Sequence, residues 1–131
     1  MNLIQVPGSY SIIRLEPEHP IPHWMMKSRF YSLSKSDEEL SIVCESSVIP
    51  EGEYKREDNW ICLKVEGTLD FSLTGVLSSL VQPLAEAKVS VFAISTFNTD
   101  YLLVKEIETE RTISVLESSG FSIDRVKEKK A

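Results

Sequence analysis

The stretch GVLSSLVQPLAEAKVSVFAISTFNTDYLLVKEI, residues 75–107, holds one helical pattern and two strand patterns in direct succession. Apolar residues in its first part, 75–88, recur at the spacing that forms one face of a helix. Residues 89–97 and 101–107 are rich in β-branched, aromatic and other apolar side chains, and a short polar break separates them. The stretch therefore predicts a helix that leads into a β-hairpin.

The segments on either side of this stretch complete an order of helices and strands. Residues 60–65, WICLKV, are nearly all apolar, as expected of a strand covered on both faces. A short helix is predicted at 109–119, stopped by Gly120, and FSIDRV at 121–126 is predicted as a final strand. The order strand, helix, strand, strand, helix, strand favours one antiparallel sheet with both helices on one face. This is an α+β, ferredoxin-like fold with βαββαβ connectivity.

The first half of the chain is predicted as strands with irregular connections. Residues 9–16, 29–34 and 39–45 have strand patterns, and the last two form a hairpin around the polar turn KSDE. The segment PEHPIPHW at 17–24 is rich in proline, which excludes a regular helix there. Residues 48–59 are polar and are expected to hold only a short helical turn.

This order suggests that the first half is a degenerate copy of the second. We predict a first unit over residues 1–57 and a second over 58–131, with the two sheets intertwined if 60–65 serves as a junction. No clear sequence repeat supports the copy by itself. Whether the first half forms a complete unit stays open.

Composition argues against several classes of protein. The chain of 131 residues carries 14 basic and 20 acidic residues, a net charge of −6, which repels a polyanion, so no nucleic acid partner is expected. No segment approaches the roughly 18 apolar residues of a membrane helix, and the N-terminus lacks a signal peptide pattern. We therefore expect no membrane association and a cytoplasmic location. Cys44 and Cys62 lie in apolar runs and are predicted to be buried free thiols, with a redox pair as the alternative.

The sequence contains no recognisable catalytic constellation. His19 and His23 have the spacing of a helical metal site, but Pro20 and Pro22 between them exclude that helix, so no metal is expected. The motifs of nucleotide-binding loops and of serine hydrolases are absent from the sequence. We therefore predict a protein that is not an enzyme and needs no cofactor.

The beginning of the 75–88 helix is a candidate site for a carboxylate. The first amides of a helix have no partner within the helix, and they lie at the positive end of the helix dipole. Gly75 would let a ligand approach the backbone, because it has no side chain. An ordinary glycine at a helix start explains the same residue equally well.

Three motifs within residues 69–106 indicate a family resemblance. They are T-G-V at 74–76, Q-P-L-A-E at 82–86 and I-S-T-F-N-T-D-Y-L-L-V at 94–104. In these motifs the chain resembles the ACT regulatory domains of aspartate kinase, and especially the tandem-ACT branch to which the eukaryotic cytosolic arginine sensors belong. A weaker match over 29–65 implies a degenerate ACT-like unit in front. The resemblance thus implies tandem ACT-like units with the ferredoxin-like order.

ACT domains bind amino acids or similar metabolites at interfaces between two domains, so the resemblance implies an allosteric regulatory protein. The ligand would be held by the loop before the first helix and by the strand that ends in S-T-F-x-x-D. Carried over by motif, the ligand-binding residues are Thr74, Gly75, Val76, Thr96, Phe97 and Asp100. Because the chain holds about two units, a homodimer would be needed to rebuild the interface. Ser79 and Leu80 would then face the partner's ligand.

Two questions stay open at the level of the sequence. Asp100 is explained either by turn propensity, with Asn98 and Thr99 at the reversal, or by contact with a ligand amine. The ligand is undecided, because the arginine-binding branch has an acidic residue where this chain has Ser72, and Asp70 could substitute for it. The alternative function is a ligand-free ACT-like module for protein–protein interaction. The downstream protein partner is unknown.

Overall fold

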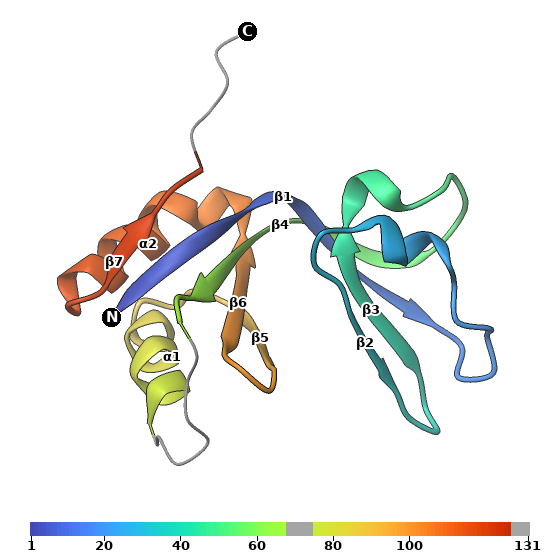
Figure 1. The fold of residues 1–131 in the computed structure, drawn as a ribbon, viewed down its shortest axis with the longest axis horizontal. Helices are drawn as coiled ribbons and strands as arrows, with labels where there is room; N and C mark the ends of the chain where they lie inside the picture. Colours follow the sequence, from blue (N-terminus) through green and yellow to red (C-terminus); the bar gives the residue numbers. More distant parts are fainter. Residues whose placement is uncertain (68–74, 127–131) are drawn as a thin grey trace, which may run out of the picture. The chain divides into compact units, whose positions relative to one another are not determined.

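The computed structural model describes residues 1–67 and 75–126 (Figure 1). The strands are β1 (Asn2–Leu15), β2 (Ser32–Lys35), β3 (Leu40–Glu45), β4 (Lys55–Val65), β5 (Val91–Ser95), β6 (Asp100–Lys105) and β7 (Ser122–Asp124). The helices are α1 (Val76–Glu86) and α2 (Thr109–Ser118), with short 3-10 helices η1 (Trp24–Lys27), η2 (Ser46–Val48) and η3 (Glu106–Glu108). In the part of the chain described, no helix has the length and apolar character needed to cross a membrane.

The chain divides into two compact units. The first, which we call the helical unit, contains Met1–Pro7 and the chain from Ile61 onward. The second, the hairpin unit, is Gly8–Trp60. Strands β1 and β4 contribute residues to both units. The predicted first unit, residues 1–57, differs from the hairpin unit, because Met1–Pro7 belong to the helical unit.

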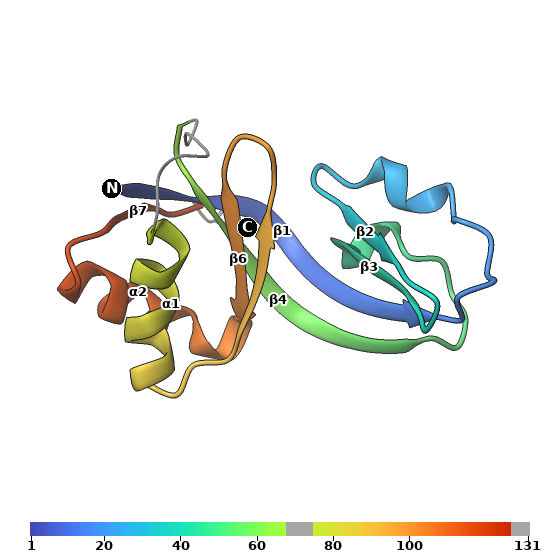
Figure 2. The ribbon, with the colours of Figure 1, turned by 90° about the horizontal axis from the view of Figure 1, so that it is seen from below.

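In the helical unit two helices cover one face of the sheet (Figures 1 and 2). The strand order is β7-β1-β4-β6-β5, and β5 and β6 are antiparallel, with Val91 opposite Val104. Both helices and strands β1, β4 and β6 contribute buried residues to one core, and Val91 of β5 and Ile123 of β7 pack against it. The buried residues of this core are Leu3, Ile61, Leu63, Val65, Leu80, Leu84, Val89, Leu102, Val104 and Leu116. The predicted helix, hairpin, second helix and final strand are confirmed, with shifted boundaries.

Strand β1 begins at Asn2, seven residues before the strand predicted at 9–16. Leu3 lies opposite Ile123 of β7 in a parallel pairing, and β1 in turn lies beside β4. The N-terminus thus inserts between β4 and β7, which are neighbours in a simple ferredoxin-like sheet, and the sheet is not purely antiparallel. Burial of Leu3 in the core favours this position. Asn2 supports it, since its amide oxygen accepts a hydrogen bond from Ser122 Oγ at 2.6 Å.

The hairpin unit contains the strand order β2-β3-β1-β4. The predicted hairpin is confirmed as β2 and β3, in which Leu33 lies opposite Ile42. Its two helical segments, η1 and η2, are single 3-10 turns. The buried core is smaller than that of the helical unit and consists of Ile13, Leu15, Met25, Leu40, Ile42 and Cys44. Trp24 and Tyr54 add an edge-to-face contact with ring centroids 6.2 Å apart.

Strand β4 begins at Lys55, within the polar connection predicted at 48–59. Polar residues have low strand propensity, but pairing with β1 within the sheet outweighs that preference here. The predicted helical turn in this region lies slightly earlier, at η2. The prediction of a connection is therefore wrong for residues 55–59, which belong to β4.

Both cysteines are free and buried, as predicted. Burial raises the pKa of Cys62 to about 12. Burial also raises the pKa of Cys44 to about 11, although the nearby Arg56 charge acts in the opposite direction. Both thiols are therefore protonated at neutral pH, the unreactive form.

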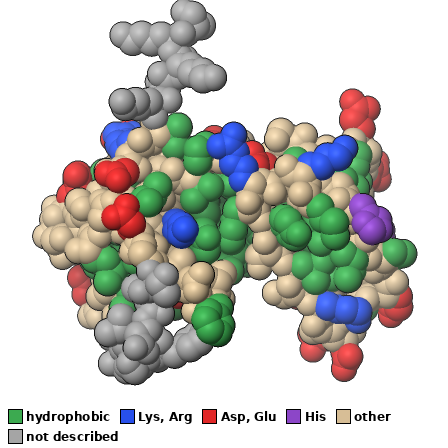
Figure 3. Space-filling model, viewed as in Figure 1, with side chains coloured by type: hydrophobic (Ala, Val, Ile, Leu, Met, Phe, Trp, Pro, Cys, Tyr) green, Lys and Arg blue, Asp and Glu red, His purple; other side chains and the backbone are tan. Residues whose placement is uncertain are grey.

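Several large hydrophobic side chains lie on the surface. In the hairpin unit these are Ile21, Met26 and Tyr31, and Figure 3 shows hydrophobic side chains gathered over this unit. In the helical unit Phe97 and Ile107 are 78% and 90% exposed. Exposed apolar residues that gather on one surface are a feature of interaction sites, whereas single ones are common.

Candidate functional site

The turn between β5 and β6 carries two of the predicted ligand contacts, Thr96 and Phe97. Its closure depends on Thr96, whose amide donates to the Thr99 carbonyl at 2.8 Å. The Thr96 hydroxyl donates to the same carbonyl at 3.0 Å and accepts from the Thr99 amide at 3.3 Å. Thr96 is therefore engaged within the turn, and only the remaining lone pair of its hydroxyl is available to a ligand. Phe97 lies at the tip and faces solvent.

Thr99 fixes the turn to the rest of the helical unit. It is only 3% exposed, and its hydroxyl donates to the carbonyl of Val65, the last residue of β4, at 2.8 Å. A buried hydroxyl with a satisfied hydrogen bond stabilises one position of the turn. From the sequence, Thr99 is predicted only as part of the chain reversal. Because its partner is 34 positions away in the sequence, no local pattern reveals this role.

Asp100 begins β6 and lies directly opposite Ser95, the last residue of β5. The Ser95 hydroxyl donates to Asp100 Oδ1 at 2.7 Å. Asp100 is half-buried, whereas Ser95 is exposed. The carboxylate thus has one partner from its own hairpin and keeps acceptor capacity for another donor, since a carboxylate offers about four lone-pair positions.

The beginning of α1 contains Gly75 and Val76. Gly75 has φ +77°, a left-handed conformation that favours glycine, and a Cβ atom placed on it would have nothing within 4 Å. Its carbonyl accepts from the Ser79 amide at 2.8 Å, as expected where a helix begins. Val76 is half-buried against the core. Thr74, together with Asp70 and Ser72, lies outside the described residues.

The two predicted partner contacts on α1 differ in their exposure. Ser79 is exposed, and its hydroxyl donates to the Val76 carbonyl at 2.7 Å. Leu80 is 0% exposed and belongs to the core. The prediction that Leu80 faces a partner's ligand is therefore wrong for this conformation, because the apolar stripe that identified the helix points this residue at the sheet.

The three segments of the candidate site lie at one end of the helical unit. Figures 1 and 2 show the end of β4, the beginning of α1 and the β5–β6 turn at this same end. The bond from Thr99 to Val65 fixes the turn there. The beginning of α1, where Gly75 is exposed, suits an anion, and the carboxylate of Asp100 suits a cation. A zwitterion meets both requirements.

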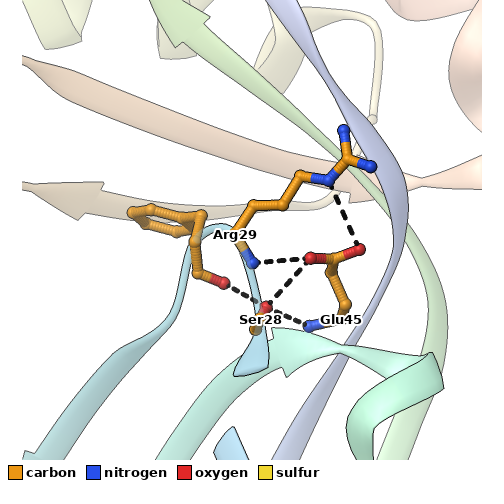
Figure 4. A network of polar contacts seen from close by, with 4 residues as sticks. Ser28, Arg29 and Glu45 are labelled. Carbon is orange, nitrogen blue, oxygen red and sulfur yellow. Dashed lines mark hydrogen bonds and ion pairs between the residues drawn. The ribbon is translucent and has the colours of Figure 1, made fainter. Parts of the chain in front are cut away.

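A polar cluster in the hairpin unit is centred on Glu45 (Figure 4). Its carboxylate accepts from the Arg29 amide at 2.6 Å, and Arg29 Nε lies 3.8 Å from its other oxygen. The Ser28 hydroxyl accepts from the Glu45 amide at 2.9 Å and donates to the Phe30 carbonyl at 2.6 Å. A Cβ atom at Gly8 would lie 2.9 Å from Glu45 Oε2. These polar groups bind one another, so the cluster is structural.

A second cluster in this unit joins β1, η2 and β4. Asp58 Oδ1 accepts from Ser11 Oγ at 2.5 Å and from Arg56 Nε at 2.8 Å. Ser46 Oγ lies 2.6 Å from Ser11 Oγ, and since Ser11 has one hydroxyl hydrogen, Ser46 is then the donor. The bond from Ser11, aided by Arg56, lowers the pKa of Asp58. This cluster too is satisfied internally.

The structure offers no preformed metal site within the described part of the chain, since no three histidine, cysteine or acidic side chains converge there. The His19 ring lies against its own loop, with Nδ1 2.6 Å from the Pro20 carbonyl oxygen. Residues 19–23 do not form a helix, as expected from Pro20 and Pro22, so His19 and His23 do not lie one helical turn apart.

Both halves of the chain match protein-family models. Residues 55–118 match the family model of the ACT domain, and residues 8–52 match a second model described as an N-terminal domain. The chain is 28% identical over 100 residues to the human cytosolic arginine sensor for mTORC1 subunit 1. That match covers 69% of this chain and 30% of the sensor, so the chain spans less than a third of the relative's length.

Solved structures of other proteins have the same fold as this chain. A protein from Agobacterium tumefaciens has a TM-score of 0.91 and 34% identity, over 99% of this chain and 96% of the other. The ligand-free regulatory subunit of aspartate kinase from Thermus thermophilus has a TM-score of 0.65 and 9% identity, over 90% and 96%. At 9% identity the second likeness concerns the fold alone.

Proposed function

The chain belongs to the ACT-domain family, and on this premise we propose that it is a non-catalytic regulatory protein that binds an amino acid or a related metabolite. The family resemblance predicted from the T-G-V, Q-P-L-A-E and S-T-F-x-x-D motifs is confirmed by the ACT model match. The proposal extends that match to a ligand, to its site and to a cytoplasmic location like that of the curated relative.

The observation that carries the proposal is the position of the β5–β6 turn. Thr99 holds this turn at the end of β4, at the end of the unit where α1 begins. The amides of Gly75 and Val76 would receive the α-carboxylate, and Asp100 would receive the α-ammonium group. Thr74, Thr96 and Phe97 would complete the contacts by analogy with the family motif.

We further propose that the ligand lies between ACT units of a homodimer, with the exposed Ser79 turned to the partner's ligand. A ligand that contacts both chains favours the assembled state, because it shifts any equilibrium in which the two states bind it differently. Amino acid concentration would thereby control the exposure of a surface to a downstream protein. Gel filtration with light scattering, with and without ligand, measures this coupling.

The amino acid itself is not specified by these residues. Arginine is the ligand named for the curated relative. Ser72 replaces the acidic residue of the arginine-binding branch, and a buried guanidinium that lacks one carboxylate partner is penalised by several kcal/mol. A screen over all twenty amino acids is therefore the appropriate test.

Thermal unfolding in the presence of each amino acid tests the proposal. A ligand at a hundredfold its dissociation constant stabilises the native chain by about 2.7 kcal/mol, which raises the melting temperature by several degrees. Asp100→Asn should abolish the shift while the chain stays folded. If no amino acid changes the melting temperature of the wild-type chain, the proposed function is wrong.

Two glycines provide a matched pair for the carboxylate half of the site. Gly75 and Gly120 both have positive φ, +77° and +95°, and both have open space where a Cβ would lie. Alanine at either position should therefore cost a similar backbone strain of about 1 kcal/mol. Only Gly75→Ala should also weaken amino acid binding. Equal affinities of the two variants would place the carboxylate elsewhere.

The hydrophobic surface of the hairpin unit favours a second candidate function, a ligand-free module for protein–protein interaction. Ile21, Met26 and Tyr31 are each more than 40% exposed, and exposed apolar side chains that form one patch are typical of interaction surfaces. This alternative predicts an assembly state that does not respond to any amino acid or to Asp100→Asn. It also predicts that Met26→Ser changes that assembly.

A further inference from the structure

The pairing of Ser95 with Asp100 is a feature that the family motif does not assign to the ligand site. The two residues lie directly opposite each other at the open end of the hairpin, where β5 ends and β6 begins. Ser95 Oγ donates to Asp100 Oδ1 at 2.7 Å, a short bond of the charge-assisted kind. Ser95 is exposed, so its hydroxyl has no role in the core.

This bond restricts the orientation of the carboxylate. A free aspartate on a strand rotates among several side-chain conformations, and fixing it when a ligand binds costs entropy. The Ser95 hydroxyl holds Oδ1 before any ligand arrives. Oδ2 then keeps its full acceptor capacity, because the hydroxyl has a single hydrogen to donate.

The turn beyond the pair makes the arrangement rigid. Thr96 is bonded to Thr99 through its amide and its hydroxyl, and Thr99 is bonded to Val65. The backbone that carries Ser95 and Asp100 is therefore fixed both within the hairpin and to the end of β4. Rigid support of this kind is what a precise binding group requires.

We infer that Ser95 is a positioning residue that presents the carboxylate of Asp100 to the α-ammonium group of the ligand. The inference rests on the proposed function, because it assumes that Asp100 receives this group. It adds a specificity role: Ser95 increases the preference of the site for an amino acid over the analogue that lacks the amine. Ser95 does not touch the ligand in this arrangement and acts through Asp100.

The probes are L-amino acids, each matched with the 2-hydroxy acid of the same side chain, such as alanine with lactate and phenylalanine with phenyllactate. The 2-hydroxy acid keeps the carboxylate and the side chain but replaces the ammonium group. We define the ratio as the dissociation constant of the 2-hydroxy acid divided by that of the matched amino acid, each measured by calorimetry or by thermal shift. A high ratio therefore reports the contact between the ammonium group and Asp100. A variant that merely loosens the hairpin would weaken both probes and leave the ratio unchanged.

The variants are Ser95→Thr and Ser95→Val. Threonine and valine have nearly the same shape and both favour strands, so both chains should fold, and only threonine keeps the hydroxyl. We expect Ser95→Thr to retain the wild-type ratio. Ser95→Val should lower the ratio about threefold to tenfold, the effect of one hydrogen bond.

The outcomes separate this inference from the proposed function. Absence of binding by every amino acid would overturn both. If Asp100→Asn lowers the ratio to about one while Ser95→Val and Ser95→Thr both keep the wild-type ratio, the proposed function is supported and the role of Ser95 is overturned. A ratio that falls in Ser95→Val and is restored in Ser95→Thr would support both.

Discussion

The two units of the chain share β1 and β4 but are stabilised in different ways. In the helical unit two α-helices cover the sheet, and ten buried residues form its core. In the hairpin unit six buried residues form the core, and single helical turns replace the helices. Side-chain clusters around Glu45 and Asp58 join its strands and turns instead. Where a unit lacks the apolar area to order its connections, hydrogen bonds from side chains take that role.

The largest expected effect concerns the two cores. Leu84→Ala in the helical unit should lower the free energy of unfolding by about 3–4 kcal/mol, because it leaves a cavity among fully buried side chains. The matched Leu40→Ala in the hairpin unit should cost about 2–3 kcal/mol, since fewer buried residues surround the cavity. Urea unfolding measures both values.

Two optical probes sharpen this experiment. Both tryptophans, Trp24 and Trp60, belong to the hairpin unit, so fluorescence follows that unit, whereas far-UV circular dichroism follows α1 and α2. Coincident curves would indicate that the units unfold together. If Leu40→Ala costs more than Leu84→Ala, the smaller core is not the weaker one, and the comparison fails.

The next effect tests the polar clusters of the hairpin unit. Ser28→Ala should lower the free energy of unfolding by about 2 kcal/mol, because it leaves the Glu45 amide and the Phe30 carbonyl without this partner in a part-buried site. Ser47→Ala, an exposed serine in the same unit, should change stability by less than about 0.5 kcal/mol. Similar values for the two variants would show that the cluster does not stabilise the unit.

Alkaline pH should weaken each unit through one thiol. The pKa of Cys62 is raised from 9.0 to about 12 and that of Cys44 to about 11, so the folded chain keeps protons that the unfolded chain loses above pH 9. The stability that these thiols contribute is complete below pH 9 and falls as the pH rises toward the folded values. Each thiol should remove about 1.4 kcal/mol per pH unit in this range.

Urea unfolding at several pH values between 8.5 and 10.5 measures this slope. Because lysine and tyrosine also titrate there, the wild-type chain is compared with Cys62→Ala and with Cys44→Ala. Each variant should have a shallower slope by the contribution of one thiol, whatever its stability at pH 8.5. Slopes that equal that of the wild-type chain would contradict the burial of the thiol.

Sequence predicted the elements that have a strong local period. The α1 stripe and the β5–β6 hairpin follow from side-chain spacing alone, and the motifs within them indicated the family. The beginning of β1 was missed because its partners, β7 and β4, are remote in the sequence, and because Pro7 and Gly8 interrupt its strand pattern. Residues of β4 before Trp60 were missed because sheet pairing outweighs their polar character.

Some residues of the candidate site are likewise indicated by the sequence, whereas others are found only in the structure. The motif named Gly75, Phe97 and Asp100, whereas Leu80 was expected to face a partner's ligand only because a homodimer was expected. Its burial follows from the apolar stripe of the helix, which outweighs that expectation. Thr99 and Ser95 act through partners, the Val65 carbonyl and the Asp100 carboxylate, that only the sheet register places beside them. Residue types indicate what chemistry is available, and pairing across strands decides which groups already have a partner.

The smallest effect concerns a polar defect in the helical unit. Thr112 of α2 is fully buried, and its hydroxyl has no hydrogen-bond partner within the described structure. Valine has the same shape without the hydroxyl, so Thr112→Val should raise the free energy of unfolding by about 1 kcal/mol. Thermal and urea unfolding measure the change.

Thr109, at the beginning of the same helix, is the matched control. Its hydroxyl donates to the Glu106 carbonyl at 2.7 Å at an exposed position. Thr109→Val removes this hydrogen bond, so it should lower the free energy of unfolding by about 0.5–1 kcal/mol. This change has the opposite sign from that expected for Thr112→Val. If Thr112→Val also lowers stability, its hydroxyl is satisfied in solution. The helical unit would then contain a second buried polar contact beside the bond from Thr99 to Val65.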